Sequence, residues 1–461
     1  MTRAATLQLL TNSFDDGSFF DELARRVAIR TESQRPDRRD ELSRYLDEEI
    51  RPALAGLGYT VQIFENPVKA AGPFLIGRRI ESHEYQTVLT YGHGDVVRGL
   101  EPEWSDGLDP WTLAVRGDRV YGRGVADNKG QHSINLAALG AVVATRGHLG
   151  FNSIVLIETG EEVGSPGIHE FVRSHRNLLA ADVLIASDGP RLNPNRPTLF
   201  MGSRGALNLD FEVRLRDSAH HSGNWGGLLA NPGVVLAHAL ASIVDRHGRV
   251  LVPELVPAKL SESVRSALAD CEIEPSEGSP DIDPNWGEPG LTPAEQLFGW
   301  NTFEVLAFRT GNSDHPVNAI PPVATAHCQV RYTIDTDPAT FVQALRRHLD
   351  GAGFREVAVR ATPGPPSWQA TRLDPDHPWV QWAAASVEQT TGARPAMLPN
   401  LGGSLPNDAF AIELGLPTIW IPHSYASCSQ HAPNEHGLVS IMREGLQIMG
   451  GIFWDLGEHP T

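Results

Sequence analysis

Residues 152–162 read "NSIVLIETGEE", an apolar run of strand length that ends in two adjacent carboxylates, Glu161 and Glu162. A short, continuous apolar run closed by a glycine turn predicts a strand that is buried on both faces. Three further runs have the same character: "TVLTYGHGDVV" (87–97), "ADVLIASDG" (181–189) and "PTIWIPHS" (417–424). Helical patterns at 128–147 and 166–180 lie between the first three runs. This alternation predicts an α/β fold, with a mainly parallel sheet and helices on both of its faces.

A different pattern begins near residue 206. The segments 206–216 and 325–335 alternate between apolar and polar side chains, which indicates antiparallel strands with one packed face and one wet face. Helices fit at 232–246 and 338–350, and a further strand fits at 355–361. This order is typical of a small α+β domain of the split βαβ type.

The fourth apolar run follows this small unit in the chain, so the small domain is predicted to be an insertion. We expect a main domain formed by residues 1–205 and 371–461, and an inserted domain formed by residues 206–370. Residues 250–298, which are rich in Pro, Glu and Ser, look like a long loop with a short helix and receive no functional assignment.

Composition excludes several classes of protein. The chain has 461 residues, which is more than one core usually holds, and a formal charge of −18 from 38 basic and 56 acidic residues. No basic stripe stands out, so nucleic acid is not an expected partner. No apolar run approaches the ~20 residues of a membrane helix, and the N-terminus lacks a signal-peptide pattern, so we expect a cytoplasmic protein without a membrane partner. The three cysteines fit neither a disulfide framework nor a Cys-x-x-Cys zinc site.

Polar side chains follow the predicted strands of the main domain, where an open α/β sheet usually binds its ligand. They are His93 and Asp95, Asp127, Glu161 and Glu162, Asp188, and His431. Each alone has an ordinary explanation, because Asp is a preferred helix cap, turn acids are usually solvated, and core histidines are common. Asp95, two residues from His93, could accept a ring proton from that histidine and so orient it. Together, however, these side chains favour a common site.

A cation would explain why so many acids gather at one edge. Four carboxylates in one crevice would repel each other and raise some of their pKa values unless a cation lay among them. Two histidines and three or four carboxylates suit Zn²⁺ or Mn²⁺, and one shared carboxylate would allow two ions ~3.5–4 Å apart. If Asp127, Glu162 and Asp188 bind metal, Glu161 remains free to act as a general base.

The ordered motifs "GHGDVV", "GRGVADNKG", "ETGEEVGS", "SDG" and "HAPNE" resemble those of a known family. It is the dinuclear-zinc metallopeptidase family of aminoacylase, carboxypeptidase G and the carnosinase-type dipeptidases (peptidase family M-twenty). The resemblance implies two divalent ions, with zinc first and Mn²⁺ or Co²⁺ as alternatives. It implies His93, Asp127 and Asp188 on one ion, Asp127, Glu162 and His431 on the other, and catalytic roles for Glu161 and Asp95.

The inserted segment carries the resemblance further. "HHSGNWGGLLANP" resembles the segment that supplies the family's oxyanion-stabilising histidine, here His221, from the partner subunit, which implies a homodimer. "VNAIPPVATAHCQVRY" resembles the strand that brings Asn318 and Arg331 to the substrate, and Gly403 and Ser404 in "LGGSLPND" resemble the loop that receives the substrate carboxylate. Without the resemblance, Arg331 would be interpreted as an exposed sheet arginine.

The sequence therefore predicts metal-dependent hydrolysis of an amide bond in a small substrate with a free carboxylate, by a dipeptidase or related exopeptidase. N-acyl-amino-acid deacylation, which uses the same chemistry, is the alternative, so the substrate partner is a small peptide or an N-acyl amino acid. A serine hydrolase built on Ser404 is disfavoured, because Pro406 stands where the nucleophile motif requires glycine. A non-catalytic metal-binding protein would have no need of Glu161.

Overall fold

The computed structural model describes residues 2–273, 280–363 and 368–458, so the part of the 250–298 segment at 274–279 lies outside the described residues. An eight-stranded sheet has the order β1-β2-β6-β3-β7-β17-β9-β16. Its strands are β1 (Thr60–Phe64), β2 (Phe74–Arg79), β3 (Thr87–His93), β6 (Asn152–Glu158), β7 (Val183–Ala186), β9 (Thr198–Phe200), β16 (Ala396–Leu398) and β17 (Thr418–Trp420). The central pairs β6–β3, β3–β7 and β7–β17 are parallel, and β1–β2 and β2–β6 are antiparallel. The predicted fold class is confirmed.

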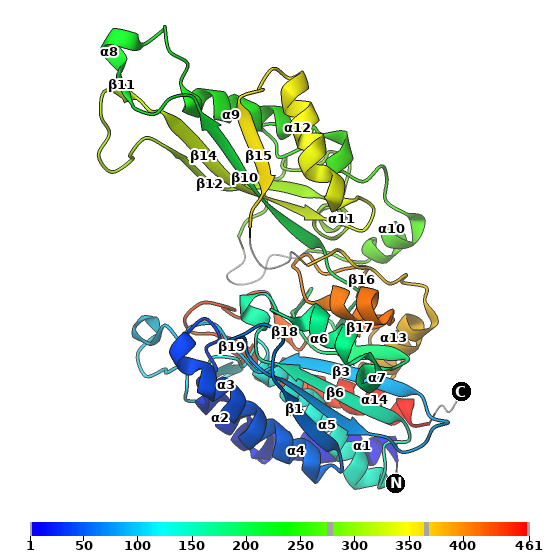
Figure 1. The fold of residues 1–461 in the computed structure, drawn as a ribbon. Coiled ribbons are helices and arrows are strands. Elements are labelled where there is room, and N and C mark those ends of the chain that lie inside the picture. The colour runs from blue at the N-terminus through cyan, green and yellow to red at the C-terminus, as the bar shows by residue number, and fades with distance from the viewer. Residues whose placement is uncertain (1, 274–279, 364–367, 459–461) are drawn as a thin grey trace.

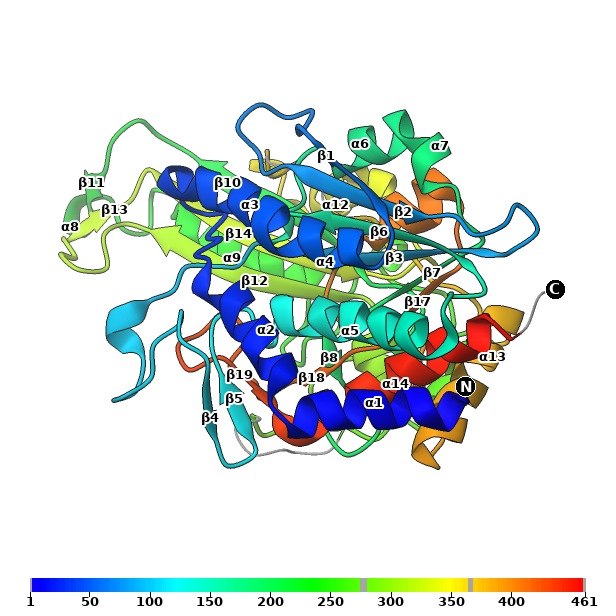
Figure 2. The ribbon, with the colours of Figure 1, turned by 90° about the horizontal axis from the view of Figure 1, so that it is seen from below.

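Helices cover both faces of this sheet because each central strand is apolar on both sides. In β6, Val155 and Ile157 join one buried cluster, and Ile154 and Leu156 join the other. The first face carries α1 (Arg3–Asp15), α2 (Ser18–Ala28), α5 (Lys129–Arg146), α13 (Pro378–Thr391) and α14 (Val439–Leu456), of which α1, α5 and α14 pack against one another (Figure 2). The second face carries α6 (Ile168–Ser174), α10 (Glu262–Leu268), α11 (Pro293–Gly299) and residues 409–414.

A second, four-stranded antiparallel sheet has the order β12-β14-β10-β15 and its own buried core (Figure 1). Its strands are β10 (Gly205–Arg214), β12 (Thr302–Thr310), β14 (Val323–Tyr332) and β15 (Val357–Ala361), and its helices are α9 (Pro232–Ile243) and α12 (Phe341–Gly351). The order β10-α9-β12-β14-α12-β15 is the predicted split βαβ arrangement. On β10, Leu209, Phe211 and Val213 point into this core, as their alternation predicts. The exact domain boundaries at 206 and 370 stay a prediction.

Three details differ from the sequence-based expectation. The predicted helix 166–180 is two helices, α6 and α7 (Arg176–Leu179), which are separated at His175. The helical spacing of Phe19, Leu23 and Val27 predicts one helix near the N-terminus, which is α2, whereas α1 before it was not predicted. The 250–298 segment contributes α10 and most of α11, whose Val264, Leu268 and Phe298 lie in the second-face cluster of the large sheet. Among the described residues, no helix combines the length and apolarity needed to cross a bilayer.

Short strands complete the structure around the carboxyl edge of the large sheet. They are β4 (Ala114–Arg116), β5 (Arg119–Tyr121) and β19 (His436–Leu438), which form one small sheet, and β8 (Pro190–Arg191) and β18 (Ser424–Tyr425), which form another. Because β19 pairs with β5, the segment around residue 436 lies beside the chain that leads into α5. This pairing brings two distant parts of the sequence to the same edge.

The close contact between β3 and α5 predicts a strict requirement for glycine at position 92. A Cβ on Gly92 would lie 2.6 Å from His132 Cβ and 3.1 Å from Asn128 Oδ1. Gly92→Ala should therefore lower the free energy of unfolding by roughly 1–3 kcal/mol through overpacking. Chemical denaturation of the purified variant measures this change.

Gly140→Ala within α5 is the matched control. The new Cβ would meet only Leu57, at 3.5 Å, and alanine is favoured over glycine inside a helix by roughly 0.5–1 kcal/mol. This variant should be as stable as the natural protein or more stable. Equal stability of both variants would contradict the packing of α5 on β3 at Gly92.

Candidate metal centre

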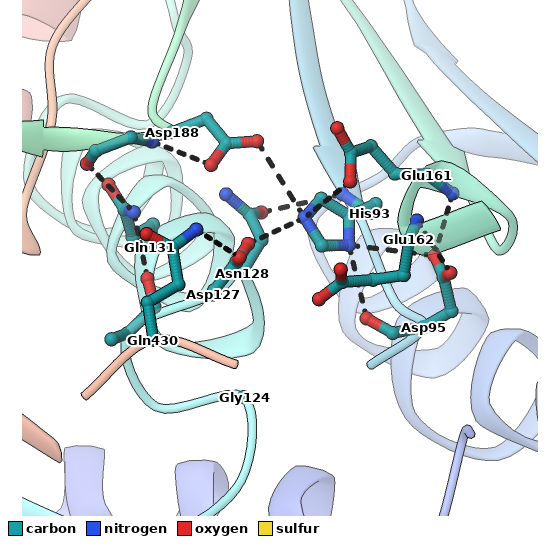
Figure 3. A network of polar contacts seen from close by, with 12 residues as sticks. His93, Asp95, Gly124, Asp127, Asn128, Gln131, Glu161, Glu162, Asp188 and Gln430 are labelled. Atoms are coloured by element: carbon teal, nitrogen blue, oxygen red, sulfur yellow. Dashed lines mark hydrogen bonds and ion pairs between the residues drawn. The ribbon is translucent and has the colours of Figure 1, made fainter. Parts of the chain in front are cut away.

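The carboxyl edge of the large sheet gathers the seven polar residues that the sequence predicted to share one site. His93 ends β3, Glu161 and Glu162 begin the short helix Glu161–Val163 after β6, and Asp188 follows β7. Asp127 precedes α5, and His431 lies in the loop before β19. Figure 3 shows His93, Asp127, Glu161, Glu162 and Asp188 converging from these elements. Their convergence follows from parallel strands ending at one edge.

His93, Asp127 and Asp188 form the first group of potential ligands. The Nε2 atom of His93 lies 2.9 Å from Asp127 Oδ1 and 3.7 Å from Asp188 Oδ2. All three residues are buried, and one ligating atom from each lies within 4.8 Å of the others. Asp188 Oδ1 accepts a hydrogen bond from Gly189 N at 2.6 Å, but nothing among the described residues hydrogen-bonds to its buried Oδ2. An acceptor atom left in this state is suited to a cation.

Asp127, Glu162 and His431 form the second group, so that Asp127 belongs to both. His431 Nε2 lies 3.0 Å from Asp127 Oδ2 and 2.9 Å from Glu162 Oε2. The two oxygens of Asp127 therefore face different histidines. Gln430 also donates a hydrogen bond to Asp127 Oδ2. A carboxylate shared in this way has the arrangement of a bridging ligand.

Glu161 belongs to neither group, although it lies beside them. Its Oε2 atom is 4.0 Å from His93 Nε2, and the residue is 8% exposed. Burial raises the pKa of Glu161 well above its usual range; the His93 charge opposes this shift, and the charges of Glu162, Asp127 and Asp188 add to it. A carboxyl group with a raised pKa at the edge of such a site has the character of a general base.

The other acids of the centre also titrate abnormally. Burial and the charge of Asp127 raise the pKa of Glu162 to about 7 and that of Asp188 to about 6. Hydrogen bonds to Asp127 and Glu162 raise the pKa of His431 to about 10, although burial opposes the shift. Burial would raise the pKa of Asp127, but hydrogen bonds from His431 and His93 lower it below its usual range. These shifts show that the carboxylates of the centre repel one another unless a cation balances their charge.

Asp95 contacts both His93 and the turn that carries the two glutamates. The closest contact of His93 Nδ1 is the main-chain oxygen of Asp95, at 3.1 Å, and the Asp95 carboxylate is 3.5 Å away. The carboxylate also accepts hydrogen bonds from the backbone N–H groups of Glu161 and Glu162, both at 3.2 Å. Asp95 thus fixes the turn that carries the two glutamates relative to β3.

Glu435 is a supporting residue that sequence reasoning did not single out. Its buried carboxylate accepts hydrogen bonds from the backbone N–H groups of Gly124, Ala126 and Asp127 at 3.0–3.2 Å, and it pairs with Arg123 at 2.7 Å. Its position in the "HAPNE" motif, four residues after His431, is the signal that could have identified it. Glu435 joins the loop of His431 to the turn of Asp127.

The remaining predicted site residues lie apart from the two ligand groups. Arg331 on β14 donates a hydrogen bond to Ser404 Oγ at 2.8 Å, and Gly403 beside it is exposed. His221 and Asn318 meet at the outer end of the small domain, where β11 (His220–His221) pairs with β13 (Ala319–Ile320) and Ser222 N donates to Asn318 O at 2.9 Å (Figure 1). Within one chain, this end lies far from the metal centre (Figure 1).

Comparisons with known proteins give the chain its family. Residues 89–455 match the peptidase family M20/M25/M40. The Beta-Ala-His dipeptidase of Mus musculus is 25% identical over 84% of this chain and 81% of that protein. The cysteinylglycine-S-conjugate dipeptidase of Corynebacterium striatum is 26% identical over 75% of each protein. The crystal structure of human carnosine dipeptidase 1 shares the fold, with a TM-score of 0.78, 23% identity and 99% of each chain covered.

The family match extends from the third strand of the large sheet to the last helix, and it therefore includes both ligand groups and Glu161. The predicted resemblance and the predicted class of enzyme, a metal-dependent hydrolase, are confirmed. The chain belongs to the peptidase family M20/M25/M40.

Proposed function

We propose that this protein is a dipeptidase that uses two divalent metal ions to hydrolyse the amide bond of a small substrate with a free carboxylate. The observation that carries the proposal is Asp127, whose two oxygens face His93 and His431 in two separate ligand groups, with Glu161 free beside them. Relatives named as dipeptidases support this substrate class over N-acyl amino acids, the alternative that the sequence left open.

The residues of the centre fit metal ions. Nitrogen and carboxylate donors within 4.8 Å of one another suit Zn²⁺, with Mn²⁺ and Co²⁺ as alternatives, and the buried Asp188 Oδ2 lacks a hydrogen-bond donor among the described residues. His93, Asp127 and Asp188 would hold one ion, and Asp127, Glu162 and His431 the other. Bound ions supply Lewis-acid polarisation of the scissile carbonyl and lower the pKa of water.

Glu161 supplies the proton transfer. Its carboxylate removes a proton from the attacking water and then delivers it to the nitrogen of the departing amine. Asp95 holds the backbone of Glu161 by a hydrogen bond at 3.2 Å, so the base cannot drift from the ligand beside it. Glu162, the adjacent residue, would hold a metal ion, which explains why two like charges follow one strand.

Arg331 recognises the substrate carboxylate together with Gly403 and Ser404. A guanidinium can pair with a carboxylate through two parallel hydrogen bonds, and its contact with Ser404 already orients it. Asn318 and His221 act on the substrate that is bound in the partner subunit. His221 is the oxyanion-stabilising group. Because these two residues lie far from the centre of their own chain, this role requires a homodimer.

An exposed apolar strand at the edge of the small sheet supports the proposed homodimer. Strand β12 lies at the edge of this sheet and leaves Val305, Leu306 and Phe308 between 42% and 60% exposed. An exposed apolar edge strand is a natural site of association between chains. The three free, buried cysteines support a cytoplasmic location, where thiols stay reduced.

Glu161→Gln tests the proton-transfer role. Glutamine keeps the size of the side chain but cannot accept the proton, so kcat for dipeptide hydrolysis by the zinc-loaded protein should fall by roughly 10²–10⁴-fold. The variant should still bind metal, because Glu161 belongs to neither ligand group. Metal content and initial rates on one preparation measure both effects. Glu170→Gln, an exposed carboxylate on α6, is the matched control and should keep full activity. Undiminished hydrolysis by Glu161→Gln would refute the assignment.

Glu162→Gln tests the charge balance of the centre through pH. The pKa of Glu162 is about 7 in the folded, metal-free protein against 4.5 in an unfolded chain, so the folded state binds the proton more tightly. Its contribution to stability therefore falls as the pH rises from about 4.5 to 7, and glutamine escapes this loss. We therefore compare the free energy of unfolding of the variant with that of the natural protein, both in EDTA. The difference, variant minus natural, should rise by up to about 3 kcal/mol between pH 5 and pH 8.

Urea denaturation at the two pH values measures this difference. With zinc added at pH 8, the natural protein should be the more stable of the two. Metal binding stabilises it more than the variant, because the variant lacks one ligand. A stability difference that is independent of pH would show that Glu162 does not titrate in the centre.

Arg331→Ala tests carboxylate recognition. Loss of the guanidinium should lower kcat/KM for a dipeptide by roughly 10–100-fold, as expected for a hydrogen bond to a charged group, and should affect the corresponding dipeptide amide much less. Arg360→Ala on strand β15 of the same sheet, where the arginine side chain is 69% exposed, is the matched control. An equal loss on the dipeptide and on its amide would assign Arg331 a structural role.

A further inference from the structure

A cavity of about 330 Å³ lies between the start of β12, helix α11 and the hairpin at residues 244–250. It contains no residue of the two ligand groups and no residue to which a catalytic role was assigned above. Its walls combine apolar side chains, among them Trp286, Leu297 and Trp300, with charged ones, among them Arg204, Glu288 and Glu304. A mainly apolar cavity with a few charged groups is the usual form of a small-molecule site.

The apolar wall is exposed and held in place. Trp286 is 53% exposed and Leu297 is 39% exposed, so much of their apolar surface faces solvent. The Trp286 ring is backed by Gly248, where a Cβ would lie 2.4 Å from the indole, and Gly287 N donates a hydrogen bond to His247 O at 2.6 Å. The ring is therefore presented to the cavity by a tightly packed hairpin. An apolar group of a ligand would gain from covering it.

The charged wall offers one cation, Arg204, and one anion, Glu304, which attract each other without reaching ion-pair distance. Arg249 and Glu288 form an ion pair at 3.3 Å and balance each other. No ion pair within 4.0 Å joins Arg204 or Glu304 to any other residue in the part of the chain that the structure describes. Arg204 is only 6% exposed, and its guanidinium donates hydrogen bonds to the carbonyl oxygens of Gly402 and Trp300. A buried cation of this kind favours an anionic ligand group.

We propose that this cavity binds a free α-amino acid with an apolar or aromatic side chain. Its carboxylate pairs with Arg204, its ammonium group with Glu304, and its side chain covers Trp286 and Leu297. A zwitterion suits the cavity because the four lining charges, Arg204, Arg249, Glu288 and Glu304, sum to zero. The inference rests on the proposed function in one respect, since amino acids of this class are the products of dipeptide hydrolysis.

The cavity has a direct structural connection to the proposed carboxylate subsite. Arg204 Nε donates to Gly402 O at 2.9 Å, and Arg204 O accepts a hydrogen bond from Ser404 Oγ at 2.7 Å. Ser404 Oγ in turn accepts from Arg331 at 2.8 Å. An amino acid on Arg204 therefore acts on the loop that receives the substrate, and the ligand groups of the metal centre are untouched. We expect a bound product to change KM more than kcat.

Titration of the zinc-loaded protein with L-phenylalanine tests the proposal. Calorimetry should show a site that Trp286→Ala and Glu304→Gln each weaken at least tenfold, while kcat/KM measured without added amino acid stays within twofold. Two analogues separate the charges, because 3-phenylpropionate lacks the ammonium group and phenethylamine lacks the carboxylate. Glu304→Gln should weaken the binding of L-phenylalanine but leave the affinity for 3-phenylpropionate unchanged. General damage to the fold would not produce this pattern.

The outcomes separate this inference from the proposed function. L-phenylalanine binding that neither variant alters, or that a dipeptide displaces competitively in full, would overturn the cavity assignment. Dipeptide hydrolysis without such binding would leave the function standing and refute the site. Binding with the predicted variant pattern but no hydrolysis would support the site and refute the function.

Discussion

The carboxylate of Asp127 is the point on which the rest of the structure depends. Its two oxygens lie 2.9 Å from a nitrogen of His93 and 3.0 Å from a nitrogen of His431, although His431 is 304 residues away in sequence. Around it the fold buries Glu161, Glu162 and Asp188, whose pKa values are raised by burial and by mutual repulsion. Repulsion among these carboxylates lowers the free energy of unfolding when no metal is bound. Packing in the rest of the core offsets this loss, as it often does at functional sites.

Two further carboxylates hold this arrangement by accepting backbone hydrogen bonds. Asp95 fixes the turn of Glu161 and Glu162 from β3, and Glu435 fixes the turn of Asp127 from the loop that carries His431. Both are almost fully buried, and Glu435 is also compensated by Arg123. The turns that carry the ligands are thus connected through hydrogen bonds between a carboxylate and the main chain. Supporting contacts of this kind orient metal ligands in many proteins.

The sequence predicted the parts that depend on local pattern. Apolar runs predicted β3, β6, β7 and β17. Because these strands are parallel, the residues that follow them lie at one edge of the sheet. For the Pro- and Glu-rich segment the sequence predicted one short helix, whereas the structure has α10 and α11. Thr292 and Glu295, which form a capping box at the start of α11, are the signal that could have indicated the second helix. The break at His175 was missed because the apolar pattern continues through it.

Contacts that depend on tertiary structure were beyond the sequence. Glu435 was quoted within a motif, but its partners are backbone N–H groups about 310 residues earlier, which no side-chain pattern reveals. The hydrogen bond between Arg331 and Ser404 joins the small sheet to a loop of the large one, and only the family resemblance, not the local pattern, had placed both residues at the substrate carboxylate. The carboxylate of Asp95 lies 3.5 Å from His93, which it was expected to orient, and it also accepts hydrogen bonds from two peptide groups that the sequence did not indicate. Local periodicity carries no information on such long-range pairs.

The most direct test of this account is an anomalous-scattering map from crystals of the protein grown with zinc. The account predicts two peaks on either side of the Asp127 carboxylate, one contacted by His93 and Asp188 and the other by Glu162 and His431, with Glu161 bound directly to neither. A single peak, or a peak coordinated by Glu161 in place of Glu162, would contradict the division of labour between the two adjacent glutamates.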